Sequence, residues 1–455
     1  MNYINENEPK DPPRSRRKKA GGKAKLFIAA IIAAAMLIGI MAGAGIYLYK
    51  SKGKFSADDK AAASFGHTEV KAETEAETET KTEADLSEEY FDIKVKNPDI
   101  NAADLEKAEI EQKLSELTKA GFIPIEQSNK DEITMSFAGD ILFDEHYAIM
   151  SSMLGRSKGA PDITTAFDAA MLSYMRNADI FIVNNEFPYS DRGEPRPNKK
   201  FTFRARPQYA SLLKDMGADG VTLANNHVND YGTEAMLDTF TTLEAINMPY
   251  AGAGRNLDEA AKPIYYTNGN VKIAVIAATQ IERMSNPDTV GATDTTPGVL
   301  RSVSDSELGR LLDAVKKAKT EGCFVTVCIH WGTEGSENVD DWQLRQGKEI
   351  AAAGADLIVG NHPHVLERLD YIGDTPIIYS LGNYLFNSKT QDTCLYSVTL
   401  SAEDAALKEI RFIPAIQSGC RTFAAEGSEK ERILSYMRNL SPAVNIDSDG
   451  IISKK

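Results

Sequence analysis

Short apolar runs that alternate with helical segments restrict the fold of this chain more than any other feature. Six runs have the length and the apolar content of buried strands, and helical segments lie between most of them. This alternation predicts an α/β domain built largely from parallel βαβ units. The expected strands are residues 133–140, 180–186, 220–227, 272–279, 324–330 and 356–362, and the expected helices include 166–176, 233–246, 305–319 and 342–353.

The segment 376–417 has a different composition. It is richer in Val, Tyr and Phe, and no helical pattern interrupts it. We therefore expect antiparallel strands there, which form a second sheet or extend the first.

An uncharged run at residues 26–49 is long enough to cross a hydrocarbon core of about 30 Å as a helix. A cleaved signal peptide is the alternative, because small residues (A-G-A-G) lie near the end of the run. The basic residues are denser before the run than after it, which predicts a cytoplasmic N-terminus. We expect a single-pass protein of the cell membrane whose C-terminal domain is extracellular.

Composition and periodicity divide the rest of the chain. A Thr/Glu-rich stretch has too little apolar surface to fold and predicts a disordered tether, and a short helix at 101–120 follows it. The expected organisation is a cytoplasmic basic segment (1–25), the transmembrane helix (26–49), the tether (50–100), a short helical lead-in (101–130), the α/β domain (131–417) and a C-terminal helical tail (418–455).

The net charge of the chain is −15 and the sequence pI is about 5.1. No basic surface is expected beyond the first 25 residues. Nucleic acid is therefore not an expected partner.

Polar residues with metal-binding side chains end five of the expected strands. Ligands of open α/β sheets bind at the carboxyl ends of strands. One such residue alone indicates a turn, and the HPH sequence at 362–364 alone is equally consistent with a turn that holds two hydrogen-bonded histidines. The coincidence across five strands favours one metal site formed by Asp140, Glu186, Asn226, His330, His362 and His364.

Carboxylate, amide and imidazole donors together suit a divalent transition metal, namely Mn, Zn or Fe, better than calcium. With Glu186 as a bridge, the set could hold two ions about 3.5 to 4 Å apart, which activate a water and clamp a phosphoryl group. His227 is then the expected proton donor to the leaving group, and Asp230, three residues later, is expected to orient its ring.

Six ordered motifs carry a resemblance to a known family. They are GD (139–140), NNE (184–186), ANNHVNDYG (224–232), HWGTE (330–334), GNHPHV (360–365) and SLGNYLF (380–386), and together they resemble the CapA family of capsule and poly-gamma-glutamate synthesis, a relative of calcineurin-like metallophosphoesterases. The resemblance covers residues 131–416. It implies a four-layer α/β/β/α sandwich of metallophosphoesterase type, and by position it implies the same metal ligands and the same Asn-His pair.

One position departs from the pattern that the resemblance implies. The related phosphoesterases have Gly-Asp-x-His in the first motif, and here Leu142 occupies the histidine position. Leucine cannot bind a metal, so one of two ion sites loses a ligand. Asp144 or His146 in the following turn is the candidate replacement.

Three further residues are expected to bind substrate. Arg204 either binds a phosphate or carboxylate or pairs with a structural acid. Asn383 either closes the pocket or forms a turn. Glu334 in the HWGTE motif is the third candidate.

The sequence supports three functions. The resemblance implies a membrane-anchored extracellular component of capsule or poly-gamma-glutamate biosynthesis or export. Its partners would be an anionic surface polymer (poly-gamma-glutamate or capsular polysaccharide) and membrane synthesis or export proteins. The ligand set favours a metal-dependent phosphoesterase acting on a cell-envelope phosphate ester. The third function is a noncatalytic polymer-binding module.

Overall fold

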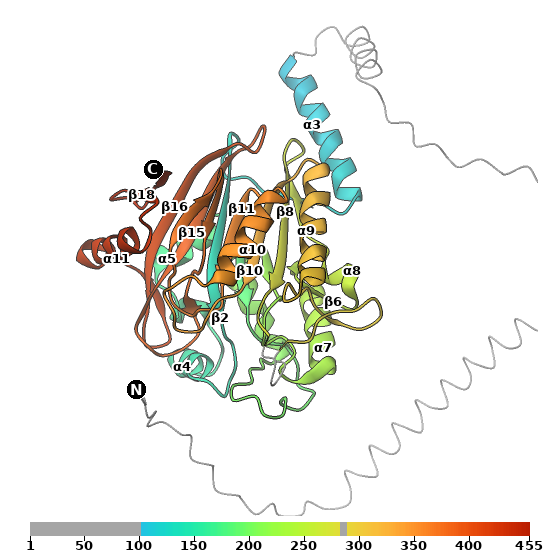
Figure 1. Cartoon of the computed structure of the whole chain (residues 1–455). Helices are drawn as coiled ribbons and strands as arrows, with labels where there is room; N and C mark the ends of the chain where they lie inside the picture. The colour runs from blue at the N-terminus through green and yellow to red at the C-terminus, as the bar shows by residue number, and fades with distance from the viewer. Residues whose placement is uncertain (1–101, 283–288) are drawn as a thin grey trace, which may run out of the picture. The chain divides into compact units, whose positions relative to one another are not determined.

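The computed structural model describes residues 102–282 and 289–455, which contain two large sheets (Figure 1). The first sheet has seven strands in the order β1 (Ile123–Pro124), β7 (Ile264–Thr267), β8 (Lys272–Thr279), β10 (Phe324–His330), β11 (Leu357–Asn361), β13 (Thr375–Ile378) and β12 (Leu369–Ile372). The second sheet has the order β17 (Thr422–Ala424), β16 (Leu407–Gln417), β15 (Gln391–Ser401), β2 (Glu132–Ile141), β3 (Ile180–Asn185), β4 (Gly220–Thr222) and β5 (Tyr250–Ala251), and β14 (Asn383–Leu385) pairs with β2.

Helices and shorter elements complete the described chain. The helices are α3 (Ala102–Lys119), α4 (Ala148–Arg156), α5 (Ala169–Arg176), α6 (Ser211–Asp215), α7 (Gly232–Ala245), α8 (Leu257–Ala260), α9 (Asp305–Thr320), α10 (Asp341–Ala352) and α11 (Gly427–Leu440), with 3₁₀ turns at Ile163–Thr165 and Pro207–Ala210. Two small sheets pair β6 (Ala253–Gly254) with β9 (Gly298–Val299) and β18 (Val444–Ile446) with β19 (Ile452–Lys454).

Local sequence sets where the long helices begin. Ser304 and Glu307 form a capping box at the start of α9, and Asp340 and Gln343 form another at the start of α10. Each box satisfies backbone N–H groups that the first helical turn leaves unpaired. These two helices therefore begin within one residue of the positions that the sequence predicts.

A core between the two sheets holds them face to face. Met135 and Phe137 of β2 pack in the same buried cluster as Val275 of β8 and Val359 of β11. Side chains alternate between the two faces of a strand, so the intervening residues of each strand face outward. The sheets therefore share one apolar layer.

The outer face of each sheet is covered by helices. Phe181 of β3 packs in a cluster with Met171 of α5 and Phe240 of α7. Val327 of β10 packs with Leu311 of α9 and Ile350 of α10, and α9 and α10 lie over the first sheet in Figure 1. The layers therefore follow the order helix, sheet, sheet, helix, and the α/β class predicted from the sequence is confirmed.

All six strands predicted from the apolar runs are present, as β2, β3, β4, β8, β10 and β11. The pairs β2–β3, β3–β4, β8–β10 and β10–β11 are parallel. The predicted helices correspond to α5, α7, α9 and α10. The strands fall into two separate sheets, however, and the local pattern did not predict which strand joins which sheet.

The prediction for the segment 376–417 is partly wrong. β15 and β16 form antiparallel pairs and extend the second sheet beyond β2. β13 is parallel to β11 on one side and antiparallel to β12 on the other, whereas β14 pairs in parallel with β2. Composition does not encode strand direction, because both directions bury the same side chains. The segment 418–455, predicted as a helical tail, contains α11 and the strands β17, β18 and β19.

No helix within 102–282 or 289–455 is long and apolar enough to span a membrane. The predicted transmembrane helix at 26–49 and the predicted tether at 50–100 lie outside the described residues.

Two glycines allow close backbone approach beside the strand ends. A Cβ atom at Gly139 of β2 would lie 1.9 Å from the carbonyl oxygen of Gly382, and one at Gly360 of β11 would lie 1.9 Å from that of Tyr379. The first contact brings Asn383 into register with Asp140. Glycine at these two positions is therefore a packing requirement.

Gly139→Ala should destabilise the protein by about 1–3 kcal/mol or more, because the new methyl group meets rigid backbone. The matched control is Gly309→Ala in α9, where a Cβ meets nothing within 4 Å and should raise stability by up to about 1 kcal/mol. Urea unfolding measures both changes. A Gly139→Ala protein as stable as the wild type would contradict the packing argument.

Candidate metal centre

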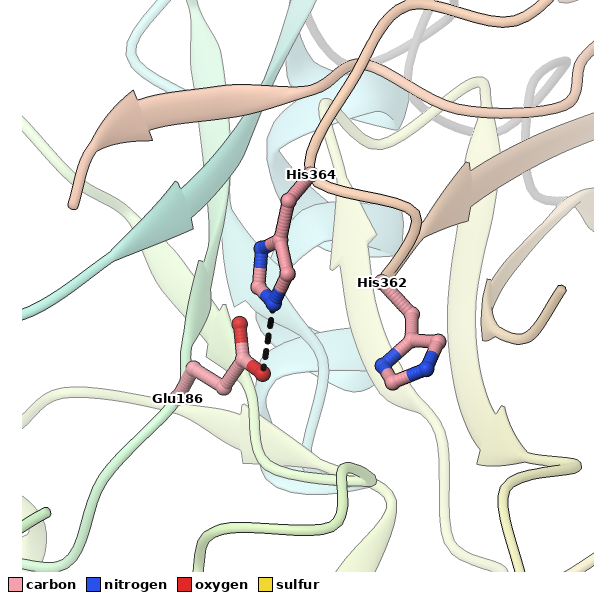
Figure 2. A group of neighbouring side chains, drawn as sticks. All are labelled: Glu186, His362 and His364. Carbon is pink, nitrogen blue, oxygen red and sulfur yellow. Dashed lines mark ion pairs between the residues drawn. The ribbon is translucent and has the colours of Figure 1, made fainter. Parts of the chain in front are cut away.

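The residues predicted as metal ligands converge at the carboxyl ends of strands from both sheets. Asp140 lies on β2, Glu186 follows β3 and His330 ends β10. The Glu186 Oε1 atom lies 3.5 Å from His330 Nε2, 3.9 Å from His227 Nε2 and 4.0 Å from His364 Nε2. Figure 2 shows His364 pointing at the Glu186 carboxylate, with His362 leaving the same loop. The folded chain therefore gathers donors that are far apart in sequence.

Glu186 is fully buried, and neither of its carboxylate oxygens has a hydrogen-bond partner among the described residues. Burial raises its pKa well above the usual value, and the negative charges of Asp140 and Glu334 raise it further. An unpaired buried carboxylate is strongly unfavourable unless it takes up a proton or a cation compensates its charge. The site therefore fits a bound divalent ion better than a cluster closed by hydrogen bonds.

Asn226, His330 and His362 place their donor atoms close together. His330 Nε2 lies 2.9 Å from Asn226 Oδ1 and 3.0 Å from His362 Nδ1. Burial lowers the pKa of His330 to about 3, although Asp140 opposes this shift. The ring is therefore neutral and offers a nitrogen lone pair, as a metal ligand must.

Asp140, His364 and Asn383 form a second group of contacts. His364 Nδ1 lies 3.1 Å from Asp140 Oδ2 and 2.9 Å from Asn383 Oδ1. Burial disfavours the charged imidazole, but the contact with Asp140 outweighs it and raises the pKa of His364. Asn383 therefore contacts the His364 ring, and its predicted role in closing the pocket or in a turn stays a prediction.

The loop after β11 holds its two histidines in strained backbone conformations. The φ angles of His362 and His364 are 99° and 60°, in a region that residues with a Cβ rarely adopt. Such conformations cost about 1–3 kcal/mol each and occur mainly at functional sites. The strain and the proximity to Glu186 favour the metal-site interpretation of the HPH sequence over the simple turn.

Asp230 and Phe203 contact the part of the His227 ring that faces away from Glu186. Its Nδ1 atom lies 2.6 Å from Asp230 Oδ2, and the Phe203 ring packs 4.2 Å from its ring. Burial lowers the pKa of His227, and Asp230 opposes this shift. The hydrogen bond directs the remaining nitrogen, Nε2, toward Glu186. The geometry agrees with the predicted pairing of His227 and Asp230.

Lys199 is a neighbour of this group that sequence reasoning missed. Its side chain is 6% exposed, and its ammonium group lies 2.6 Å from Asp230 Oδ1 and also donates to the carbonyl oxygen of Asn226. The Phe203 backbone N–H donates to the other oxygen of Asp230 at 2.8 Å. A lysine in a loop gives no local signal of this role, because the fold alone brings it to Asp230.

Asn184 is the other missed residue. Its Nδ2 atom donates to Asp140 Oδ1 at 2.7 Å and lies 3.4 Å from His330 Nδ1. Thr222 donates to its amide oxygen at 3.0 Å. Its place in the NNE motif, two residues before Glu186 and on the same face of β3, was the available signal.

The remaining predicted residues lie around this centre in other roles. The Arg204 guanidinium donates to the carbonyl oxygens of Arg192 and Gly193 and packs 4.1 Å from the Tyr231 ring. Glu334 is exposed and lines a pocket of about 340 Å³ together with His362. The pocket therefore opens directly beside the donor cluster.

Neither proposed replacement for the missing first-motif histidine joins the centre. Asp144 accepts hydrogen bonds from the backbone N–H groups of Arg204 and His146. The His146 side chain is 73% exposed and lies 3.0 Å from Asp144. In the part of the chain that the structure describes, the groups of carboxylate and imidazole donors close enough to share a metal include neither residue. Asp144 instead organises the turn after β2.

Glu186→Gln should abolish most of the stabilisation that Mn²⁺ or Zn²⁺ gives the wild type, because a neutral amide cannot compensate the ion. At about 100 times the dissociation constant, a bound ion stabilises a protein by about 2.7 kcal/mol. Thermal unfolding with and without metal measures this difference. The matched control is Glu334→Gln, which should keep most of the shift, and equal shifts in both variants would argue against Glu186 as a ligand.

Comparison with known proteins identifies the family. Residues 134–388 match the family model described as bacterial capsule synthesis protein PGA_cap. The chain is 30% identical over 297 residues to the PGA biosynthesis protein CapA of Bacillus subtilis, which covers 64% of this chain and 74% of that protein. It is 27% identical over 317 residues to the capsule biosynthesis protein CapA of Bacillus anthracis, which covers 68% of this chain and 74% of that protein.

A solved structure titled as a novel phosphatase of Mycoplasma pneumoniae overlaps 64% of this chain and 95% of its own chain at 12% identity. Its TM-score of 0.39 is too low to bear on fold or function. On the match to its central domain, this chain belongs to the bacterial capsule synthesis protein PGA_cap family.

Proposed function

We propose that this protein is a membrane-anchored, extracellular component of anionic surface-polymer biosynthesis that uses a metal-dependent hydrolytic centre. The polymer is poly-gamma-glutamate or a capsular polysaccharide, as the names of the relatives from both Bacillus species support. The buried, unpartnered carboxylate of Glu186 among three imidazoles carries the metal part of this proposal. The two central sheets and their outer helices support a metallophosphoesterase-type arrangement.

The donor atoms define which metal fits. Glu186 provides a carboxylate oxygen, Asn226 an amide oxygen, and the three late histidines provide imidazole nitrogens. This mixture suits Mn, Zn or Fe. When bound, such an ion supplies Lewis-acid activation of a water nucleophile.

Residues of the protein then have two roles, which are to position the reacting groups and to protonate the leaving oxygen. In hydrolysis of a phosphate ester, a bond forms from the water oxygen to phosphorus and the bond to the leaving oxygen breaks. The attacking water loses one proton and the leaving oxygen gains one, so it is the imidazolium form of His227, with its Nδ1–H donated to Asp230, that transfers the Nε2 proton to the leaving oxygen. Asp230 holds the opposite nitrogen, and Lys199 balances the charge of Asp230.

A noncatalytic polymer-binding role is the second candidate, and one observation favours it. Leu142 is buried in the outer core, so the first motif contributes only Asp140 toward the ions of a two-metal centre. A pocket that keeps its shape but lacks some of the metal ligands needed for catalysis would still bind polymer. Activity measurements distinguish these two functions.

His227→Ala should lower hydrolysis of model phosphomonoesters or phosphodiesters by about 100-fold or more, the usual effect of losing a general acid, while metal stays bound. The matched control is His146→Ala, which removes an exposed histidine away from the centre and should keep full activity. Steady-state kinetics and metal analysis of the same samples provide the test.

The same variants separate the two candidate functions in cells. If hydrolysis matters, a strain without this protein should recover normal polymer amount and chain length with His146→Ala but not with His227→Ala. Recovery with both variants would favour the noncatalytic role. An unchanged polymer in the deletion strain would contradict the proposed function.

The proposed topology places the α/β domain outside the cell, on the helix predicted at residues 26–49. Protease added to intact cells, after any wall is removed, should therefore digest the domain while a cytoplasmic marker stays whole. A domain that is cut only after lysis would contradict this topology.

A further inference from the structure

We infer that two phenylalanines, Phe203 and Phe386, are positioning residues that hold the imidazoles of His227 and His364 at a fixed spacing beside Glu186. This inference rests on the hydrolytic role in the proposed function and adds two residues to it. A phenylalanine ring neither binds a divalent ion nor transfers a proton, so both residues act through the imidazoles that they contact. The ring contacts, the backbone anchors and the convergence of the two imidazoles on one oxygen carry this inference.

Four rings form a continuous series of contacts beside the centre. Phe203 lies in the loop between β3 and β4, and Phe386 directly follows β14. The ring centroids of Phe203 and His227 lie 4.2 Å apart, and those of Phe386 and His364 lie 4.7 Å apart. The two phenylalanine rings meet edge to face, with their centroids 5.5 Å apart and their planes at 89°. We call the pair Phe203 and Phe386 the aromatic wall.

Each of the two imidazoles is fixed at an edge and at a face. His227 Nδ1 lies 2.6 Å from Asp230 Oδ2, and His364 Nδ1 lies 2.9 Å from Asn383 Oδ1. A contact at one nitrogen leaves the ring free to turn, because the torsion that joins an aromatic ring to its Cβ atom has broad energy wells. The aromatic wall packs against the faces of both imidazoles at tilts of 31° and 32°, which blocks this rotation. The nitrogen contact and the wall together define where each Nε2 atom points.

The aromatic wall is itself anchored by hydrogen bonds. The Phe203 backbone N–H donates to Asp230 Oδ2 at 2.8 Å, the same oxygen that lies beside His227 Nδ1. The Phe386 backbone N–H donates to the side-chain oxygen of Gln417 at 2.6 Å, and Gln417 is fully buried on β16. The two phenylalanines are only 5% and 9% exposed. The wall is therefore a fixed part of the packed structure.

The two imidazoles converge on one carboxylate oxygen. His227 Nε2 lies 3.9 Å and His364 Nε2 lies 4.0 Å from Glu186 Oε1. Glu186, His362 and His364 form one of the donor groups that could hold a metal ion. A general acid acts only within hydrogen-bond reach of the leaving oxygen, and a displacement of about 1 Å can cost about 100-fold in rate. Because it fixes His227 relative to His364, the aromatic wall sets the distance between the proton donor and these metal ligands.

The kinetic test uses the full-length protein with Mn²⁺, and bis(p-nitrophenyl) phosphate is the substrate. Phe203→Leu loosens the proton donor, so kcat should fall by about 10- to 100-fold while KM and Mn²⁺ affinity stay close to those of the wild type. Phe386→Leu loosens a ligand histidine, so Mn²⁺ affinity should fall as well as kcat. Unchanged kcat in Phe203→Leu would overturn the positioning role.

The matched control is Phe240→Leu. Phe240 is a fully buried residue of α7 whose ring stacks on Tyr250, with the two centroids 5.2 Å apart. Its replacement should lower stability in urea unfolding but leave kcat and Mn²⁺ affinity unchanged. An equal fall of kcat in Phe240→Leu would show that any lost ring has this effect, and it would overturn the inference.

Nuclear magnetic resonance tests the wall without turnover. The chain has six histidines, so His227→Gln and His364→Gln assign the two ring signals in the metal-free, full-length protein labelled at histidine. Protons over the face of a phenyl ring resonate upfield. Phe203→Leu should therefore move the His227 signals downfield, Phe386→Leu should move those of His364, and Phe240→Leu should move neither.

The two readouts separate this inference from the proposed function. Histidine signals that do not respond to the loss of their phenylalanine neighbours would overturn the inference, whatever the activity. Responsive signals in a protein that hydrolyses no phosphate ester would overturn the hydrolytic function and support the positioning geometry.

Discussion

A carboxylate cannot stay ionised inside a protein without compensating charge or hydrogen bonds, and the Glu186 side chain has no hydrogen-bond donor among the residues described. Three imidazoles lie within 4.0 Å of one of its oxygens, and burial lowers the pKa of two of them, His227 and His330, which disfavours the positive charge that would compensate it. The arrangement becomes favourable when a divalent cation lies among these groups. Much of the surrounding structure can be understood as support for that cation: the Asn184 amide donates a hydrogen bond to Asp140, and Asp230 holds the His227 ring.

Neither sheet contains the centre by itself. The second sheet supplies Asp140 and Glu186, and the loop after its strand β4 supplies Asn226. The first sheet supplies His330, and the loop after its strand β11 supplies His362 and His364. The apolar layer between the sheets therefore fixes the distance between the carboxylates and the imidazoles. Because packed interiors deform little, substitutions in this layer should change the distances between the side chains of the centre.

The charges near the centre bear on the kind of molecule that it accepts. The chain carries a net charge of −15, so an anionic polymer would be repelled unless positive charge is local. Lys199 is buried in an ion pair with Asp230, so the ion of the proposed function would supply the positive charge that an anionic substrate needs. Glu334 lies on the pocket wall near His362 and adds negative charge on that side.

The sequence by itself determined the α/β class, the positions of six strands and of four of the helices between them, and the set of metal-type side chains at the strand ends. These features follow from local periodicity and from the rule that ligands bind at the carboxyl ends of parallel strands, so no knowledge of long-range packing was needed. Only the tertiary structure decided which strands share a sheet, that β13 pairs in parallel with β11 and β14 with β2, and that Lys199 and Asn184 lie against the centre. It also placed Asn383 behind His364 and Arg204 on backbone carbonyls. These contacts join residues far apart in the chain, and local sequence encodes them weakly because they depend on how two complete sheets pack face to face.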